Sequence, residues 1–486
     1  MNRLSLIETF ITNNAFDSCV INYVTDDSRD VKKNTLFVAR QGSGSHGIEH
    51  IDDAIKNGAS CVISSQKIKK KIDIPICYMD NLEDCIVEIL FKFYELSPEK
   101  FFLHGVTGTN GKTTTAYMAH NIMRQLKKPS MYVGTIGALI NDQHILTQGN
   151  TTPGIFELFK ILNQSNREEI TYVFVEISSH ALVQKRLCNL PFHQSIILNI
   201  QSDHLDYHLS NENYINAKLS IINLNNINPT LIYIDKFKNL NFEFSKKQND
   251  LLRQSKFISS IDSKAEFYYS LDFNSHGYSK IDFQFPGLDL TLKISTLLKF
   301  NIENYISAIA LIFKHLSLSD FKKIDSQSLR LPEGRGELLK LNSGKVLIDF
   351  AHDHQSMQNI LSALAVSYKE IVLVFGCGGD RDKSKRPKMM RVAQSIAQKI
   401  IFTSDNNRFE EFALIAADAL KGNELKNTTI IENRKEAITE ALKYLNEDNI
   451  LVILGKGHET HMETLGKKII FNDKDCVLKI SNNETY

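Results

Sequence analysis

Short apolar runs separated by polar, helix-like stretches recur along the whole chain. Near the N-terminus, residues 35–39 and 59–64 are apolar runs of the length expected for buried strands, and residues 42–47 form a glycine- and serine-rich loop. This pattern predicts a small α/β domain over residues 1–99.

A second pattern begins with the apolar run at residues 101–107, which leads into a glycine-rich loop and then a helix-like stretch over residues 113–126. Further strand-like runs lie at residues 172–177 and 195–200, with helix-like segments between them. Such alternation is typical of a mainly parallel sheet. We therefore expect a central P-loop-type domain over residues 100–330, although residues 226–298 are less regular.

From residue 331 the alternation becomes clear again. It predicts a C-terminal Rossmann-like domain over residues 331–486, in which ligands bind at the carboxyl ends of the strands. The expected strands cover residues 346–350, 371–375, 400–403, 429–431 and 450–454. The predicted fold class is thus α/β with three domains.

Composition narrows the class of protein. The 486 residues are 42% hydrophobic and 23% charged, as in soluble globular proteins with several cores. A net charge of +1 gives no reason to expect a nucleic acid or a membrane as partner. Seven scattered cysteines without a C-x-x-C pair favour a reducing compartment, and neither a signal peptide nor a long apolar span is evident. We expect a cytoplasmic protein.

The glycine-rich loop carries the first candidate chemistry. Its backbone N–H groups can surround phosphate oxygens, Lys112 can reach the β and γ phosphates, and the Thr113 hydroxyl can ligate Mg²⁺. The spacing departs from the common Walker pattern, which would place a glycine at Val106. A glycine-rich turn with an incidental lysine is the alternative interpretation. The predicted ATP-binding residues of the loop are Gly108, Thr109, Asn110, Gly111, Lys112, Thr113 and Thr114.

This loop resembles that of the Mur ligase family, which includes enzymes that build the peptide of bacterial cell-wall precursors. The resemblance is closest to the branch that adds the third amino acid, and it implies ATP-dependent amide formation through an acyl phosphate, with release of ADP and phosphate, in the bacterial cytoplasm. It rests on six further blocks, namely residues 27–29, 150–153, 176–186, 203–208, 376–383 and 405–408, and on Gly455–Glu459.

Acyl-phosphate chemistry needs metal ions, because two anions must approach each other. Glu176 follows a predicted strand, and with Thr113 it can hold one Mg²⁺; capping of a helix or pairing with a lysine is the alternative. The resemblance implies a second Mg²⁺ held by His204 and by Lys218 as a carbamate. From the residues alone, Lys218 would be a solvated helix lysine. The catalytic set is therefore Lys112, Glu176, His204 and Lys218.

For ATP, the resemblance also implies roles for Asn304, Arg335 and Asp349. The chain departs from the family pattern here, because Lys299 replaces a glycine and residues 350–354 read Phe-Ala-His-Asp-His. These changes put the fine geometry of the nucleotide pocket in doubt.

The implied acceptor is UDP-N-acetylmuramoyl-L-alanyl-D-glutamate, a long anion held at both ends. Hydroxyls, amides and a guanidinium suit its pyrophosphate, sugar and carboxylate groups. The expected contacts on the uridine side are Asp26, Ser28, Ser43, Gly44 and Ser45, and those at the peptide end are Asn150, Thr151, Thr152, Ser178, Gln184 and Arg186.

The implied amine is meso-2,6-diaminopimelate, whose distal carboxylate Arg408 would bind. Asn407 replaces the usual proline, which frees φ and could soften the loop. L-Lysine is the alternative substrate. The expected pocket consists of Arg381, Asp405, Asn406, Asn407, Arg408, Gly455 and Glu459.

Two other functions stay open from the sequence. A folylpolyglutamate-type ligase would share the phosphate loop but not the pockets at residues 405–408 and 455–459. A nucleotide-binding protein that has lost ligation would fit the altered residues near Lys299 and His354. We expect the protein to be a monomer.

Overall fold

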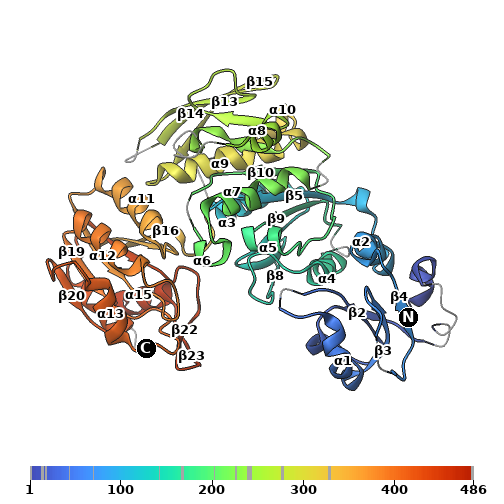
Figure 1. The fold of residues 1–486 in the computed structure, drawn as a ribbon. Helices are drawn as coiled ribbons and strands as arrows, with labels where there is room; N and C mark the ends of the chain where they lie inside the picture. The colour runs from blue at the N-terminus through green and yellow to red at the C-terminus, as the bar shows by residue number, and fades with distance from the viewer. Residues whose placement is uncertain are drawn as a thin grey trace. The chain divides into compact units, whose positions relative to one another are not determined.

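The fold is known from a computed structural model, drawn in Figure 1. It describes residues 3–11, 16, 19–42, 44–68, 71–141, 143–165, 169–201, 203–224, 227–237, 244–274, 278–326 and 330–482, without the side chain of residue 206. The chain divides into two compact units. Unit one contains residues 1–259 and 307–323, and unit two contains residues 260–306 and 324–486.

The N-terminal part of unit one is a parallel sheet in the order β1-β2-β3-β4, formed by Tyr23–Thr25, Thr35–Ala39, Ala59–Ser64 and Ile76–Tyr78. Every residue of β2 is buried, because its alternate side chains enter two different cores. Phe37 packs with α1 (Ile51–Asn57), whereas Leu36 and Val38 pack with α2 (Leu82–Phe93). The α/β prediction for this region is confirmed.

The central sheet of unit one has the order β12-β11-β10-β5-β9-β6-β7-β8. The strands from β12 to β6 run parallel, β7 is antiparallel to β6, and β8 is antiparallel to β7. β5 (Phe102–Thr107) leads directly to α3 (Lys112–Gln125), as predicted. The other bounds are β6 Ser130–Gly134, β7 Gly137–Ile140, β8 Gln143–Ile145, β9 Tyr172–Glu176, β10 Gln194–Ile197, β11 Leu231–Tyr233 and β12 Lys256–Ser259.

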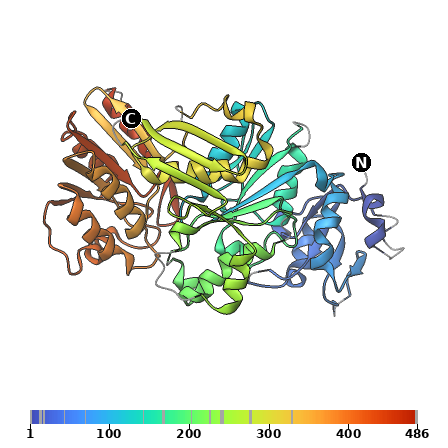
Figure 2. The same cartoon turned by 90° about the horizontal axis from the view of Figure 1, so that it is seen from above.

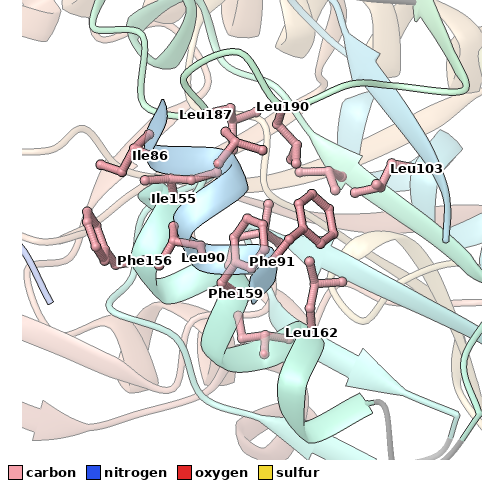
Figure 3. Packing of buried hydrophobic residues seen from close by; sticks show 14 of the residues in the cluster. Ile86, Leu90, Phe91, Leu103, Ile155, Phe156, Phe159, Leu162, Leu187 and Leu190 are labelled. Atoms are coloured by element: carbon pink, nitrogen blue, oxygen red, sulfur yellow. The ribbon is translucent and has the colours of Figure 1, made fainter. Parts of the chain in front are cut away.

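One core lies under this sheet, between α2 and α4 (Ile155–Ser165), as Figure 3 shows. Phe91 of α2 meets Phe159 of α4 edge to face, with ring centroids 4.7 Å apart. Both helices have wide apolar faces, and each buries that face against the other and against the sheet. Helix α2, which also packs on the N-terminal sheet, is held against the central sheet by this core. The core thereby supports the elements around the phosphate loop.

In unit two, β13 (Phe267–Asp272), β14 (Tyr278–Phe285) and β15 (Leu288–Ser295) form an antiparallel meander, seen as yellow-green strands in Figure 2. β14 alternates exposed and buried residues, which is typical of a sheet with one face in water. Within the irregular region of residues 226–298, residues 267–272, 278–285 and 288–295 therefore form strands of a sheet with one face in water.

The C-terminal sheet has the order β16-β17-β21-β18-β19-β20, and all its strands except β16 are parallel. Alternate residues of β18 enter opposite cores: Leu373 packs with α11 to α13, and Val374 with α14 and α15. Helices thus cover both faces, which confirms the Rossmann-like prediction. The bounds are β16 Arg335–Leu341, β17 Gly344–Asp349, α11 His354–Ala365, β18 Glu370–Phe375, α12 Lys385–Ile396, β19 Lys399–Phe402, α13 Phe412–Leu420, β20 Thr428–Ile430, α14 Arg434–Leu442, β21 Asn449–Leu454 and α15 Asp473–Ser481.

Among the described residues, no helix combines the length and the apolar character that crossing a membrane requires.

Candidate active site

The phosphate loop lies between the end of β5 at Thr107 and the first residue of α3, Lys112. Gly111, the residue before the helix, has φ of +87°, which a residue with a side chain rarely adopts. The N-terminus of a helix presents free N–H groups and a positive dipole end, which favours an anion. This geometry favours the interpretation of the loop as an anion site.

A second loop, which follows β10, holds the phosphate loop in shape. Asn110 N donates to Asn199 Oδ1 at 3.0 Å, and Asn199 Nδ2 returns a bond to Asn110 O at 3.0 Å. Asn110 Nδ2 also donates to Gln201 Oε1 at 3.1 Å. Asn199 and Gln201 are not predictable from the sequence, because an asparagine or glutamine after a strand carries no signal of its partner. Lys112 Nζ donates to the carbonyls of Gly108 and Thr109, both at 2.9 Å.

Glu176, at the end of β9, is fully buried beside the start of α3. Its carboxylate accepts bonds from the Thr113 hydroxyl at 2.9 Å, from Thr135 N at 2.9 Å and from the Thr135 hydroxyl at 3.1 Å. The Tyr132 hydroxyl donates to Glu176 Oε1. Within the described part of the chain no lysine pairs with Glu176, so the alternative of a lysine pair is wrong. Tyr132 and Thr135 were missed, because neither lies in a recognisable motif.

Lys218 lies on α7 (Asn211–Leu219) and is 1% exposed, so the prediction of a solvated lysine from the residues alone is wrong. Its Nζ donates to the carbonyl of Gly108 in the phosphate loop at 2.9 Å and lies 4.9 Å from the centre of the Tyr214 ring. Burial, together with the charge of Lys112, holds the pKa of Lys218 well below its usual range. The neutral amine is therefore easier to form at Lys218 than at an exposed lysine.

His204 stands beside this region on a turn with φ of +51°. Its Nε2 lies 3.5 Å from Asp203 Oδ2, and its ring centre lies 4.9 Å from that of His180. Across the described residues there is no group of three or more His, Cys, Asp or Glu side chains that could hold a metal ion by themselves. The oxygen pair of Thr113 and Glu176 nevertheless has the donor chemistry that Mg²⁺ prefers.

Four of the residues expected at the peptide end lie together. The Thr152 hydroxyl donates to Glu176 O at 2.9 Å and accepts from Ser178 N at 2.9 Å. Arg186 donates to Thr152 O at 3.1 Å and to Gln184 Oε1 at 2.8 Å. Thr151 accepts from Thr135, whereas Asn150 is exposed on the adjoining turn.

The residues expected on the uridine side lie at the edge of the N-terminal sheet. Asp26 accepts from Arg40 Nη1 at 3.4 Å, and burial raises the pKa of Asp26 above its usual value. The Ser45 hydroxyl lies 2.7 Å from His50 Nε2. Ser28 begins a short 3-10 turn and Gly44 is exposed, while Ser43 lies outside the described residues.

In unit two, the three residues expected to contact the nucleotide belong to α9 (Lys299–Ile312), β16 and β17. The Arg335 guanidinium lies 4.3 Å above the Phe350 ring, and burial raises the pKa of Asp349 despite the opposing charge of Arg335. Asn304 is half-buried on α9. Lys299 begins this helix, so the departure from the family pattern leaves the helix intact.

The loop that follows β19 carries the residues expected to bind the amine. Arg408 Nη1 donates to Gly379 O at 2.7 Å and, more weakly, to Asn406 O at 3.5 Å. No carboxylate of the described residues pairs with this guanidinium. Asn407 is buried, and its Nδ2 donates to Ser404 Oγ at 3.1 Å. This bond constrains the side chain at the position where the family pattern has a proline.

Glu459 and Gly455 follow β21, the strand next to β18. Glu459 Oε2 accepts from Asn406 Nδ2 and from Lys456 Nζ, both at 2.8 Å. Gly455 has φ of +112°, and a Cβ there would lie 2.5 Å from Asp405 Oδ2. Six of the seven predicted residues thus lie on the two loops at the carboxyl edge of the sheet, while Arg381 is exposed on the loop after β18. The buried Lys456 was not among the predicted residues.

Comparisons with known proteins agree with this geometry. Residues 106–312 match the Mur ligase middle domain, and residues 334–457 match the Mur ligase glutamate ligase domain. The chain is 35% identical over 458 residues to a UDP-N-acetylmuramoyl-L-alanyl-D-glutamate–2,6-diaminopimelate ligase of Fusobacterium nucleatum, covering 92% of this chain and 91% of that protein. It is 33% identical to the enzyme of the same name from Buchnera aphidicola, covering 96% and 95%.

A solved structure of an enzyme with this name superposes with a TM-score of 0.66 at 26% identity, covering 96% of this chain and 95% of that one.

Proposed function

From the premise that this chain belongs to the Mur ligase family, we propose that it joins meso-2,6-diaminopimelate to UDP-N-acetylmuramoyl-L-alanyl-D-glutamate at the expense of ATP. The chain is an ATP-dependent ligase that forms an amide bond. The observation that carries the choice of substrate is the Arg408 guanidinium, which has carbonyl partners but no carboxylate among the described residues. A second, distal carboxylate is what diaminopimelate has and lysine lacks.

Activation of the acceptor is assigned to the phosphate loop. A carboxylate is a poor electrophile, so phosphoryl transfer from ATP must first supply a leaving group. We assign the loop N–H groups and Lys112 to the phosphates, and Asn304, Arg335 and Asp349 to the rest of the nucleotide. Lys112 now donates to two loop carbonyls at 2.9 Å, and phosphate oxygens would replace these neutral acceptors.

Two Mg²⁺ ions, when bound, would neutralise charge between the phosphates and the substrate carboxylate. Thr113 and Glu176 are assigned to one ion, because their oxygens lie 2.9 Å apart and the carboxylate is fully buried. His204 and Lys218 are assigned to the other. As an ammonium Lys218 would repel a cation, whereas its carbamate presents oxygen atoms. The depressed pKa of Lys218 supports this assignment, since only a neutral amine attacks CO₂.

The acceptor is assigned to residues of unit one. We place its uridine end at Asp26, Ser28 and the loop of residues 43–45, and its peptide end at the hydroxyls and the guanidinium around Thr152 and Arg186. The hydrogen bonds that join Thr152 to the backbone of Glu176 and Ser178 support this placement, because they set the peptide site against the site of phosphoryl transfer.

The division of labour follows the three expected domains. We propose that residues 1–99 bind the UDP moiety, that residues 100–330 bind ATP and that residues 331–486 bind the amino acid. We further propose that the protein acts as a monomer in the bacterial cytoplasm.

Replacement of Arg408 tests the choice of amine. In the unmodified protein, phosphate release with meso-diaminopimelate should far exceed release with L-lysine, because lysine leaves the buried face of Arg408 unpaired. Arg408→Ala should lower this preference by about tenfold or more. Arg391→Ala, at an exposed position of α12, is the matched control and should keep the preference. Equal turnover with both amino acids in the unmodified protein would reject diaminopimelate as the substrate.

A further inference from the structure

The loops that carry the proposed amine-binding residues are tied together by a buried arginine that lies behind them. Arg434 is the first residue of α14, and its side chain is fully buried. Its Nη1 donates to Ser404 O at 3.2 Å and its Nη2 donates to Leu454 O at 3.0 Å. Ser404 directly precedes Asp405, and Leu454 directly precedes Gly455. One guanidinium therefore joins the starts of both loops.

The acidic partner of Arg434 fixes the orientation of the guanidinium. Asp473, the first residue of α15, accepts from Arg434 Nε at 2.7 Å and from Nη2 at 2.8 Å, and it is fully buried as well. A bidentate carboxylate holds the planar fork in one direction. The edge of the guanidinium that remains then faces the two strand ends.

The two loops have little room for relative movement. Gly455 approaches Asp405 so closely that a Cβ would lie 2.5 Å from Oδ2. Across the same gap, Asn406 Nδ2 donates to Glu459 Oε2 at 2.8 Å, and Lys456 Nζ donates to Asn406 Oδ1 at 3.4 Å. A small shift of β19 against β21 would break these contacts and displace the carboxylate and amide groups that face the substrate.

Apolar residues of similar size are often as stabilising as a buried ion pair. Stability alone therefore does not explain why this position holds an ion pair. Here the apolar alternative would leave the Ser404 and Leu454 carbonyls without the donors that join them. We propose that the Arg434–Asp473 pair is a positioning device, which sets the spacing of the two loops and thereby the recognition of the amino-acid substrate. This inference rests on the proposed function.

The decisive variant is the double replacement Arg434→Met with Asp473→Leu, because removal of both charges leaves no unpaired buried ion. We expect its melting temperature to stay within a few degrees of the unmodified protein. Its KM for meso-diaminopimelate should rise about 10-fold to 100-fold, because a displaced binding group loses most of its effect. The KM values for ATP and for the UDP-dipeptide should change less than about twofold, and the preference over L-lysine should fall.

Two further variants separate positioning from general loosening. Arg434→Lys keeps the positive charge but loses the planar guanidinium. This variant should also raise the KM for meso-diaminopimelate. Ile438→Ala, in the core of the same helix α14, should lower the melting temperature without changing the KM for the amino acid.

An unchanged KM for the amino acid in both Arg434 variants, or an equal rise of all three KM values, would overturn the positioning role. If instead the unmodified protein did not prefer diaminopimelate, the proposed substrate would fail. The positioning role would then be judged by the KM for whichever amino acid is used.

Discussion

Glu176 shows how closely a single residue can be confined. Three side chains and one backbone N–H donate to its carboxylate, and water does not reach it. Gly134 of β6 closes the remaining side, because a Cβ there would lie 2.1 Å from Glu176 Oε1 and 2.5 Å from the Tyr132 hydroxyl. The carboxylate thus has one available position, which suits a metal ligand that must be aligned before the substrate arrives.

Gly134→Ala should therefore displace Glu176 and lower kcat by about 100-fold, because the added methyl group cannot be accommodated in the wall of this pocket. Gly154→Ala is the matched control, since a Cβ at Gly154 meets nothing within 4 Å and should leave kcat within about twofold. Steady-state phosphate release measures both. A Gly134→Ala protein that is folded and as active as the control would show that the position of Glu176 is not critical.

Lys218 gives a second prediction at the scale of the residue. Lys218→Ala should be nearly inactive and should regain part of its activity when a small carboxylate such as acetate is added, because the added anion can replace the carbamate oxygens. Lys443→Ala removes an exposed lysine that pairs with Glu440 on the surface, and it should be silent. Full activity of Lys218→Ala without any added carboxylate would exclude the carbamate.

At the scale of elements, three histidines join segments at the amino-terminal edge of the central sheet. His104 Nε2 of β5 lies 3.1 Å from His315 Nε2, and the centre of the tilted His193 ring lies 5.6 Å from that of His104 and 4.8 Å from that of His315. Burial and mutual repulsion hold the pKa of His104 well below its usual range and lower that of His315 to about 4. Two lysines add positive charge near His315, namely Lys314 and Lys128. Lys128 Nζ donates to His315 O.

These histidines make the fold sensitive to acid. The unfolded chain takes up protons near pH 6.5, whereas folded His315 does so only near pH 4. The stability that His315 contributes is therefore present above about pH 6.5 and is lost as the pH falls toward 4. The melting temperature of the unmodified protein should fall between pH 7 and pH 5. In His315→Gln this fall should be smaller. An identical fall in the variant and the unmodified protein would contradict this linkage.

The elements themselves were largely predictable from the sequence. Buried parallel strands such as β18 and β21 are continuous apolar runs, which the eye recognises without further knowledge. The meander of β13 to β15 was not predictable, because its strands are half exposed and alternate apolar with polar residues in an irregular background. The predicted strand over residues 195–200 is real but ends at Ile197.

The candidate site was predictable only where residues stand in contiguous motifs. Glu176 and Arg408 belong to such blocks. Other residues form hydrogen bonds to the site from segments far away in the sequence, namely Tyr132, Asn199 and Arg434. Their roles depend on which strands are neighbours in the sheet. A single sequence does not contain that pairing in readable form, so the partners emerge only from the fold.

At the scale of the whole molecule, the assigned chemistry is divided between the two units. The phosphate loop, Glu176 and Lys218 belong to unit one, whereas the loops around Arg408 and Glu459 belong to unit two. Each unit alone carries only part of the groups that the reaction needs. A ligase divided in this way should therefore consume ATP only when acceptor and amine are both bound.

Phosphate release under controlled substrate supply tests this claim most directly. Purified protein with ATP and Mg²⁺ should release phosphate rapidly only when UDP-N-acetylmuramoyl-L-alanyl-D-glutamate and meso-diaminopimelate are both present, and omission of either should lower the rate to background. Nucleotide binding without substrate-dependent phosphate release, or an equal rate in the absence of the UDP-dipeptide, would contradict the assignment of this chain as a ligase of that acceptor and that amine.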